Sequence, residues 1–268
     1  MVGPGNVKVV VWKKIGIQEV KKQLFLSPKD RLIVALDVNT RDEAERLVDQ
    51  LQPFVGAFKV GMQLYNSEGP PIVRLLNERG GKVFVDLKFH DIPNTVAQAG
   101  RVMTRLGAFM YNLHVAGGRE MMRCAVEATR KEAEIRGGQS PLILGVTVLT
   151  SITSQQLREE IGIERDLTEQ VVEWAKMAKE AGLDGVVASP QEITALRKAC
   201  GPEFLIVTPG VRPAGAQRND QQRVMTPGEA IKAGASYLVV GRPITAASNP
   251  AAAAQAIVEE MENAVVLK

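Results

Sequence analysis

The chain has 268 residues, a net charge of +3, and 45% hydrophobic but only 4% aromatic residues. This composition indicates a soluble globular protein packed with aliphatic side chains, and it disfavours a nucleic-acid binder with stacking surfaces. No apolar stretch approaches the ~20 residues of a membrane helix, and Cys124 and Cys200 form no CxxC pair. We therefore expect a cytoplasmic protein without membrane or nucleic-acid partners.

The N-terminal residues carry a short apolar run interrupted by lysines, which does not fit a signal peptide. We expect residues 1–29 to be an extension without a catalytic role. Residues 30–268 are expected to form one domain.

Short apolar runs rich in Val, Ile, Leu and Phe recur through this domain, as expected of strands buried on both faces. They cover residues 31–37, 57–62, 82–88, 109–115, 142–149, 185–189, 204–210 and 237–244.

Helix signals lie between these runs. The segment "TRDE" (40–43) fits a capping box, and "SPQE" (189–192) and "TPGE" (226–229) repeat it with proline at the first helical position. Asp166 and Glu169 have the same spacing before an apolar stretch of helical period. Glycines precede several of the next strands, where they can end a helix.

Eight strands alternating with helices over about 240 residues predict a single-domain α/β protein, a closed (β/α)8 TIM barrel. An open doubly wound sheet is the alternative. It usually carries a GxGxxG turn after the first strand, and "LDVNTRDE" (36–43) has none.

Charged residues interrupt the apolar runs at the ends where barrels carry their active sites. Asp86 and Lys88 are two residues apart and so share one face of their strand. Lys59 comes from the preceding strand, and Asp91 follows in the loop. We expect these four side chains to form an array of alternating charge that keeps Lys88 protonated and aimed. The alternative is an ion-pair network that serves only stability.

A second candidate site follows the last two strands, where barrels commonly bind phosphate. Gly210 and Gly241 would let backbone N–H groups approach an anion, and Arg242 would fork onto its oxygens. The polar segment between these strands is expected to close over the phosphate with Arg212 and Gln221, or else to be an idle surface loop.

The segment "DLKFHDIPNT" (86–95) resembles the DxKxxDIPxT signature of the orotidine 5′-monophosphate decarboxylase family. The blocks "ALDV", "FKVGM", "VTVLTS", "TPGVR", "NDQQRVMTP" and "VVGRPI" resemble the other blocks of that family, in the same order. The resemblance runs from about Arg31 to the C-terminus. It implies a homodimeric enzyme that converts orotidine 5′-monophosphate to UMP and CO2 without metal or cofactor.

The resemblance also implies residue roles. Lys88 would protonate C6 of the pyrimidine, Asp86 would lie beside the departing carboxylate, and Lys59 would hold the network and a ribose hydroxyl. Asp91 and Thr95 would reach across a dimer interface into the neighbouring site. The remaining substrate contacts would come from Asp37 at the ribose, Thr150 and Ser151 at the pyrimidine edge, and Arg212, Gln221, Gly241 and Arg242 at the 5′-phosphate.

Three rival functions stay open on the residues alone. A barrel decarboxylase acting on a keto-sugar phosphate would use magnesium, and a barrel aldolase or isomerase would use a lysine as a Schiff-base nucleophile. A non-catalytic nucleotide-binding protein is the third. The two histidines, His90 and His114, are isolated in sequence, and we expect structural roles for both rather than metal ligation.

Overall fold

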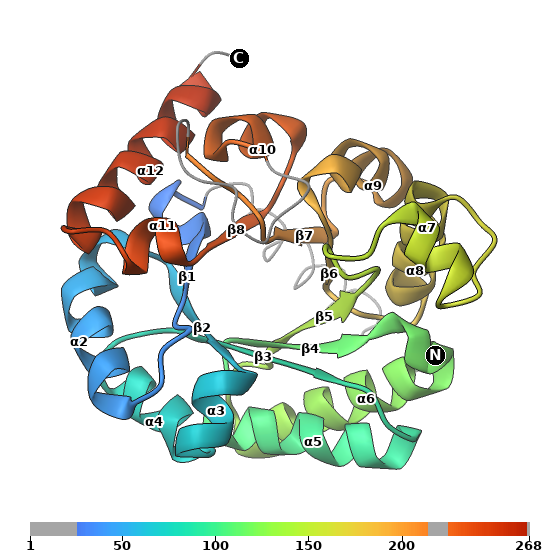
Figure 1. Ribbon diagram of the computed structural model, residues 1–268. Coiled ribbons are helices and arrows are strands. Elements are labelled where there is room, and N and C mark those ends of the chain that lie inside the picture. Colours follow the sequence, from blue (N-terminus) through green and yellow to red (C-terminus); the bar gives the residue numbers. More distant parts are fainter. Residues whose placement is uncertain (1–25, 214–224, 267–268) are drawn as a thin grey trace, which may run out of the picture.

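The computed structural model describes residues 26–213 and 225–266, which form a closed barrel of eight parallel strands (Figure 1). The strands follow the sequence order round the barrel, and β1 pairs with β8 to close it. Their bounds are β1 (Leu32–Ala35), β2 (Ala57–Gly61), β3 (Val83–Phe89), β4 (Met110–His114), β5 (Leu142–Val146), β6 (Gly185–Val187), β7 (Leu205–Thr208) and β8 (Tyr237–Val240). The predicted (β/α)8 barrel is confirmed, and the open-sheet alternative is wrong. The proposed extension over residues 1–29 stays a prediction, since residues 1–25 lie outside the described ranges.

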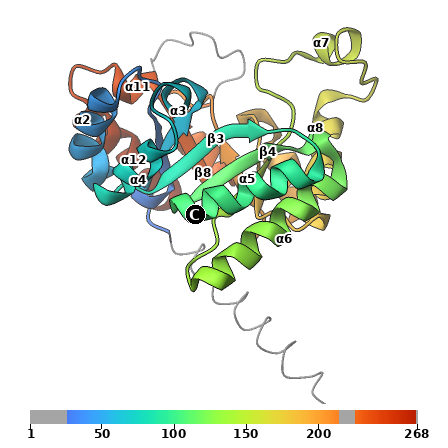
Figure 2. The same cartoon turned by 90° about the horizontal axis from the view of Figure 1, so that it is seen from below.

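Helices surround the barrel (Figure 1). They are α2 (Arg41–Leu51), α3 (Met62–Glu68), α4 (Pro71–Glu78), α5 (Pro93–Leu106), α6 (Gly118–Arg136), α7 (Ser154–Glu159), α8 (Leu167–Glu180), α9 (Ile193–Cys200), α10 (Pro227–Ala233), α11 (Arg242–Thr245) and α12 (Pro250–Val266). Short 3-10 turns cover η1 (Lys29–Arg31), η2 (Gln52–Phe54), η3 (Val115–Gly117) and η4 (Pro190–Glu192). Figure 2 shows α3, α7 and α11 at the same end of the barrel. None of the helices in the described ranges has the length and hydropathy to span a bilayer.

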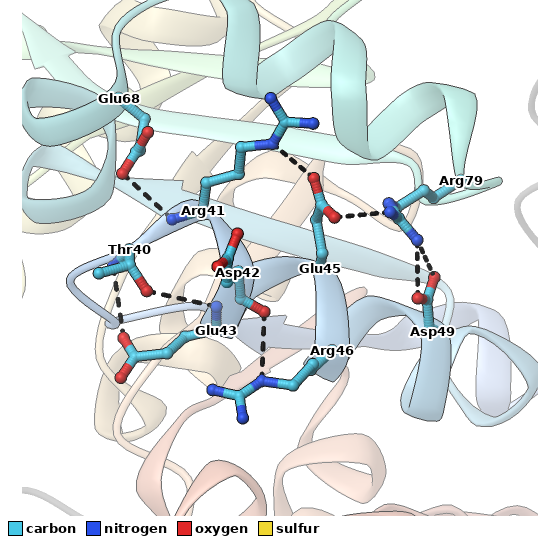
Figure 3. Close-up of polar contacts among 9 residues, drawn as sticks. All are labelled: Thr40, Arg41, Asp42, Glu43, Glu45, Arg46, Asp49, Glu68 and Arg79. Carbon is cyan, nitrogen blue, oxygen red and sulfur yellow. Dashed lines mark hydrogen bonds and ion pairs between the residues drawn. The ribbon is translucent and has the colours of Figure 1, made fainter.

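Several helices begin where their capping residues predict. The Thr40 hydroxyl accepts from the Glu43 N–H, and the Glu43 carboxylate accepts from the Thr40 N–H, both at 3.3 Å (Figure 3). Thr226 and Glu229 form the same box at α10. Asp166 accepts from the first turn of α8. These reciprocal bonds satisfy backbone donors that the helix itself leaves free.

The "SPQE" segment behaves differently from its expectation. Ser189 accepts from the Gln191 N–H and caps the 3-10 turn η4, and α9 begins only at Ile193. The Ser189 bond falls two residues on, whereas the side-chain bond of a capping box falls three residues on.

Ion pairs join α2 to the end of α4 on the surface (Figure 3). Glu45 contacts Arg41 at 2.6 Å and Arg79 at 2.5 Å, and Arg79 also contacts Asp49 at 2.7 Å. Exposed pairs of this kind contribute little to stability, so this cluster orients two neighbouring helices rather than holding the barrel together.

Two apolar clusters divide the core. The larger one lies between the strands and the helices. The smaller one takes alternate residues of the strands and fills the barrel interior with Ile33, Ala35, Ala57, Phe84, Met110, Leu144, Leu205, Val207, Tyr237 and Val239. Polar side chains replace this filling nearer the carboxyl ends of β2, β3 and β4, where Lys59, Asp86 and Asn112 continue the same alternation.

The outer face of β4 carries a buried polar contact under two helices. The Tyr111 hydroxyl and the Thr129 hydroxyl of α6 are hydrogen-bonded at 2.7 Å, and both residues are fully buried. Gly100 of α5 lies over this pair. A Cβ on Gly100 would come within 2.4 Å of the Thr129 oxygen and 2.7 Å of the Tyr111 oxygen.

Replacing Gly100 with alanine should therefore destabilise the fold. Overpacking a closed core costs roughly 1–3 kcal/mol, which exceeds the gain of about 1 kcal/mol in helix propensity. Urea unfolding measures the difference. Gly138→Ala is the matched control, because nothing lies within 4 Å of its added Cβ. Equal midpoints for the two variants would contradict the packing assigned to Gly100.

Candidate active site

A cavity of about 190 Å³ opens among the carboxyl ends of the strands. Lys59, Asp86 and Lys88 form its charged wall. Its other walls are mainly apolar and consist of Phe84, Val146, Val148, Leu149, Thr150, Val187, Pro209 and Val239. A pocket with few polar groups on an apolar surround binds and orients a small molecule.

The charged wall is a row of ion pairs. The Lys59 ammonium lies 3.1 Å from Asp37 Oδ1 and 3.4 Å from Asp86 Oδ2, and the Lys88 ammonium lies 2.6 Å from Asp86 Oδ1. The order Asp37–Lys59–Asp86–Lys88 therefore alternates in sign. Gly61 makes room for it, because a Cβ there would stand 3.0 Å from the Lys59 nitrogen.

Asp86 is the central member of this row, and its side chain is 14% exposed. Burial alone would raise the pKa of its carboxyl, but the charges of Lys59 and Lys88 and hydrogen bonds from Lys88 and Asn112 outweigh burial and lower that pKa below its usual range. Asp86 is therefore a carboxylate at neutral pH, with one oxygen toward each ammonium.

The backbone of β3 is irregular at the residues that supply this wall. Val85 pairs with Tyr111 and Phe89 with Leu113, so residues 86–88 of β3 face a single residue of β4. Lys88 has φ 54°, the only positive φ of a non-glycine residue in the described ranges. A left-handed backbone costs a residue with a Cβ about 1–2 kcal/mol. Asp86 and Lys88 do reach the same cavity, as expected, but through a bulge that re-aims side chains rather than through a regular pleat.

Asp91 does not occupy the place expected for it within one chain. It is exposed, its Oδ1 accepts from the N–H of Ile92 at 2.6 Å, and the described residues offer it no ion pair. Asp37 takes the fourth position of the charged row instead. Thr95, in the first turn of α5, is also exposed. Both side chains thus lie on the surface beside the end of β3.

Thr150 and Ser151 lie in the turn that follows β5. Thr150 lines the cavity, whereas Ser151 is exposed and is not among its lining residues. The Ile152 N–H donates to the Leu149 carbonyl at 2.9 Å and closes the turn around them. The turn therefore places Thr150 at the same cavity as the charged wall.

The residues after β7 and β8 carry positive charge. Arg212 is 8% exposed, and its buried Nε has no hydrogen-bond partner in the described part of the chain. Burial, and then the charge of Arg242, lower the pKa of Arg212, so the two guanidinium groups lie near one another. Gly241 lies beside the charged row, since a Cβ there would be 3.7 Å from Asp37 Oδ2. Gln221 lies outside the described residues.

His90 and His114 are isolated in sequence but adjacent in space, with ring centroids 5.5 Å apart. Burial lowers the pKa of His114, and the neighbouring His90 and Lys88 lower it further. The described residues contain no cluster of three or more His, Cys, Asp or Glu side chains arranged to hold a metal ion. The two rings therefore pack against each other, and His114 lies close enough to Lys88 to sense its charge.

Known proteins resemble this chain over nearly all of its length. The sequence model of the orotidine 5′-phosphate decarboxylase / HUMPS family matches residues 30–257. The chain belongs to this family. An orotidine 5′-phosphate decarboxylase of Moorella thermoacetica is 58% identical over 90% of this chain and 96% of its own length. One of Syntrophomonas wolfei is 60% identical over 88% of this chain and 100% of its own.

A solved structure resembles the fold as well. The crystal structure of orotidine 5′-phosphate decarboxylase from Lactobacillus acidophilus superposes with a TM-score of 0.77 at 40% identity, and covers 86% of this chain and 98% of its own. The resemblance to the orotidine 5′-phosphate decarboxylase family inferred from the sequence motifs is confirmed.

Within this member of the family, the motifs point to the charged wall but miss two features of the site. One is the apolar surround, where Val146 ends β5, Val148 follows that strand, and Val239 comes from β8. The other is Asn112, a fully buried amide in β4 that contacts β3. Asn112 stands two residues before His114 inside an apolar run, and this alternation is the signal that identifies it as facing inward.

Replacing Asp86 with asparagine tests the electrostatics of the wall. We expect a loss of roughly 2–4 kcal/mol in the free energy of unfolding at pH 7, because two partly buried ammonium groups lose the carboxylate between them. The folded pKa of Asp86 is lowered, so its stabilising effect is present above the unfolded pKa of about 3.9 and is lost as the pH falls through the folded value.

The difference between wild type and Asp86→Asn in urea unfolding should therefore be constant from about pH 7 to pH 5 and shrink below about pH 4. Asp49→Asn, which removes an exposed pair with Arg79, should change stability little at either pH. A difference that does not depend on pH would show that Asp86 is not ionised in the folded protein.

Proposed function

We propose that this protein decarboxylates orotidine 5′-monophosphate to UMP and CO2, the last step of UMP synthesis, without a metal or cofactor. The observation that carries the proposal is the Lys88 ammonium, held 2.6 Å from an ionised Asp86 at the wall of the cavity. The names of the relatives at 53–60% identity support the same activity.

The reaction makes a specific demand on the site. The bond from C6 of the pyrimidine to its carboxylate breaks, CO2 leaves, and the electron pair stays on C6, where no adjacent carbonyl delocalises it well. Such a barrier requires stabilisation toward the upper end of the ~8–23 kcal/mol that enzymes supply. A fixed ammonium beside the developing charge is electrostatic preorganisation, and Lys88 Nζ then gives its proton to C6.

The neighbouring charges keep Lys88 ready for this step. Asp86, beside the departing carboxylate, holds the ammonium in place, and Lys59 holds Asp86 from the other side at 3.4 Å. Lys59 and Asp37 are close enough to share the ribose hydroxyls. Thr150, with Ser151 beside it in the turn, would contact the edge of the pyrimidine.

The residues after β7 and β8 suit the 5′-phosphate. Two guanidinium groups near one another repel, and a dianion between them removes the repulsion. The buried Nε of Arg212, which has no hydrogen-bond partner among residues 26–213 and 225–266, supports this role, together with Arg242 and the backbone of Gly241. We assign Gln221 to the same phosphate. Binding energy from this remote group would help to fix the ring, so a substrate lacking phosphate should lose turnover as well as affinity.

We further propose a cytoplasmic homodimer in which Asp91 and Thr95 enter the partner's site. Both are exposed in this chain, and Ile92 between them is 67% exposed, a large apolar side chain that an interface would cover. The two free cysteines are consistent with a reducing compartment.

Lys88→Ala should lower turnover of orotidine 5′-monophosphate by at least about 10²–10⁴-fold, since a general acid contributes that much on its own. The assay follows pyrimidine absorbance in EDTA, so a magnesium-dependent keto-sugar phosphate enzyme would be inactive in it.

Lys82→Ala is the control, because Lys82 is exposed at the opposite end of β3, over the ring of Phe109. Normal activity of Lys88→Ala would refute the mechanism. A wild-type protein that binds a 6-substituted UMP tightly without turning over the substrate would instead be a nucleotide-binding protein.

Mixing Asp91→Ala with Lys88→Ala subunits should restore activity if sites are shared between chains. Each mixed dimer would contain one intact site, and random mixing gives about a quarter of the wild-type activity per site in an isologous dimer. The measurement is turnover after subunit exchange. The absence of any regain would argue against the composite site.

A further inference from the structure

Asn112 is a buried amide whose oxygen and nitrogen both hydrogen-bond to one neighbouring strand, β3. It lies in the middle of β4 and is fully buried. Its Oδ1 accepts from the backbone N–H of Lys88 at 2.8 Å, and its Nδ2 donates to Asp86 Oδ1 at 2.7 Å. A buried amide is stable only when it is hydrogen-bonded, so these two bonds fix the amide and its two partners together.

The bulge in β3 explains why an amide is needed at this place. Residues 86–88 face Asn112 alone, so regular strand pairing with β4 is interrupted there. The N–H of Lys88 is directed to a side chain instead of a backbone carbonyl of β4. Asn112 thus supports the left-handed backbone of Lys88, at φ 54°, which a regular strand would not adopt.

The other end of the amide sets the orientation of the carboxylate. Asp86 Oδ1 receives Asn112 Nδ2 as well as the Lys88 ammonium, and this leaves Oδ2 facing Lys59. One side chain therefore ties the backbone of Lys88 to the carboxylate that aims its ammonium.

We propose that Asn112 is a positioning residue for the decarboxylation, which acts by fixing Asp86 and the backbone of Lys88 in one geometry. This inference rests on the proposed function, because it assumes that Lys88 is the proton donor. Catalysis that depends on fixed charges is sensitive to such support, since a misplacement of about 1 Å can cost 10²-fold in rate.

Asn112→Asp is the sharpest test. The substitution keeps the shape and can still accept from the Lys88 N–H, but it loses the donor to Asp86 and sets a second carboxylate against it. We expect kcat to fall about 10- to 100-fold with KM changed by less than about threefold, because transition-state stabilisation and not ground-state binding is lost.

The acid limb of the pH profile should also move up in this variant. Two carboxylates in contact share a proton, which raises the pKa of the pair. The other charged and titratable groups around them are Asp37 just after β1, Lys59 from β2, Lys88 from β3, His90 just after β3, and His114 at the end of β4. These groups are common to both proteins, so the comparison with wild type isolates the effect of the substitution.

Asn112→Ser is the second variant, since it is neutral and too short to reach both partners. It should lose kcat in the same way with an unshifted pH profile. The matched control is Tyr111→Phe, which removes a buried hydrogen bond to Thr129 on the opposite face of the same strand. It should lower the melting temperature without changing kcat or the pH profile.

The outcomes separate the two proposals. If the wild type turns over orotidine 5′-monophosphate and both Asn112 variants match its kcat and pH profile, only the positioning role is wrong. Two Asn112 variants that fail to fold would also overturn it, by making the amide a requirement of the barrel itself. If the wild type has no activity, the proposed function fails, and this inference fails with it.

Discussion

The charged wall depends on one carboxylate. Asp86 lies between two ammonium groups, at 2.6 Å from Lys88 and 3.4 Å from Lys59. Only its ionised form places a negative charge between these two positive charges. At such distances and an effective dielectric constant near 20, each contact is worth about 4 kcal/mol before desolvation is subtracted. These attractions outweigh the burial of the group, and its pKa is lowered for that reason. The row is therefore set before any substrate arrives.

The barrel makes this arrangement possible by dividing its interior. Near one end, alternate strand residues such as Ile33, Phe84 and Leu144 fill the space with apolar side chains. Toward the carboxyl ends the same alternation places Lys59, Asp86 and Asn112, and Asp86 contacts both of the others. The buried apolar layer beneath supports these side chains, and close-packed protein interiors do not rearrange easily. A charge array on such a layer has little freedom to relax, which is what electrostatic preorganisation requires.

Local patterns predicted much of this molecule because their causes are local. The caps at Thr40 and Thr226, the strand runs and the barrel follow from residue type and spacing. Which side chains meet in three dimensions depends on how the strands and loops are placed, and local patterns do not specify this. Asp91 was expected to complete the row, and Asp37 does so, since the barrel brings β1 against β2 while the loop after β3 leads Asp91 away. The bulge at Lys88 and the role of Asn112 depend on the register between β3 and β4, which the sequence of either strand alone does not specify.

The bulge in β3 and the positive φ of Lys88 place side chains at the cavity at the expense of local backbone stability. A regular strand at residue 88 would avoid the left-handed backbone but would direct the side chain differently. A glycine would adopt this backbone without strain but has no ammonium. Strain at a residue with a Cβ persists only where surrounding contacts fix it, and here Asn112 from β4 and Asp86 from β3 do so. The left-handed backbone of Lys88 costs about 1–2 kcal/mol. The apolar interior offsets this cost, because burial in it comes from all eight strands of the barrel. The left-handed backbone and the ammonium that faces Asp86 therefore belong to the same residue, Lys88.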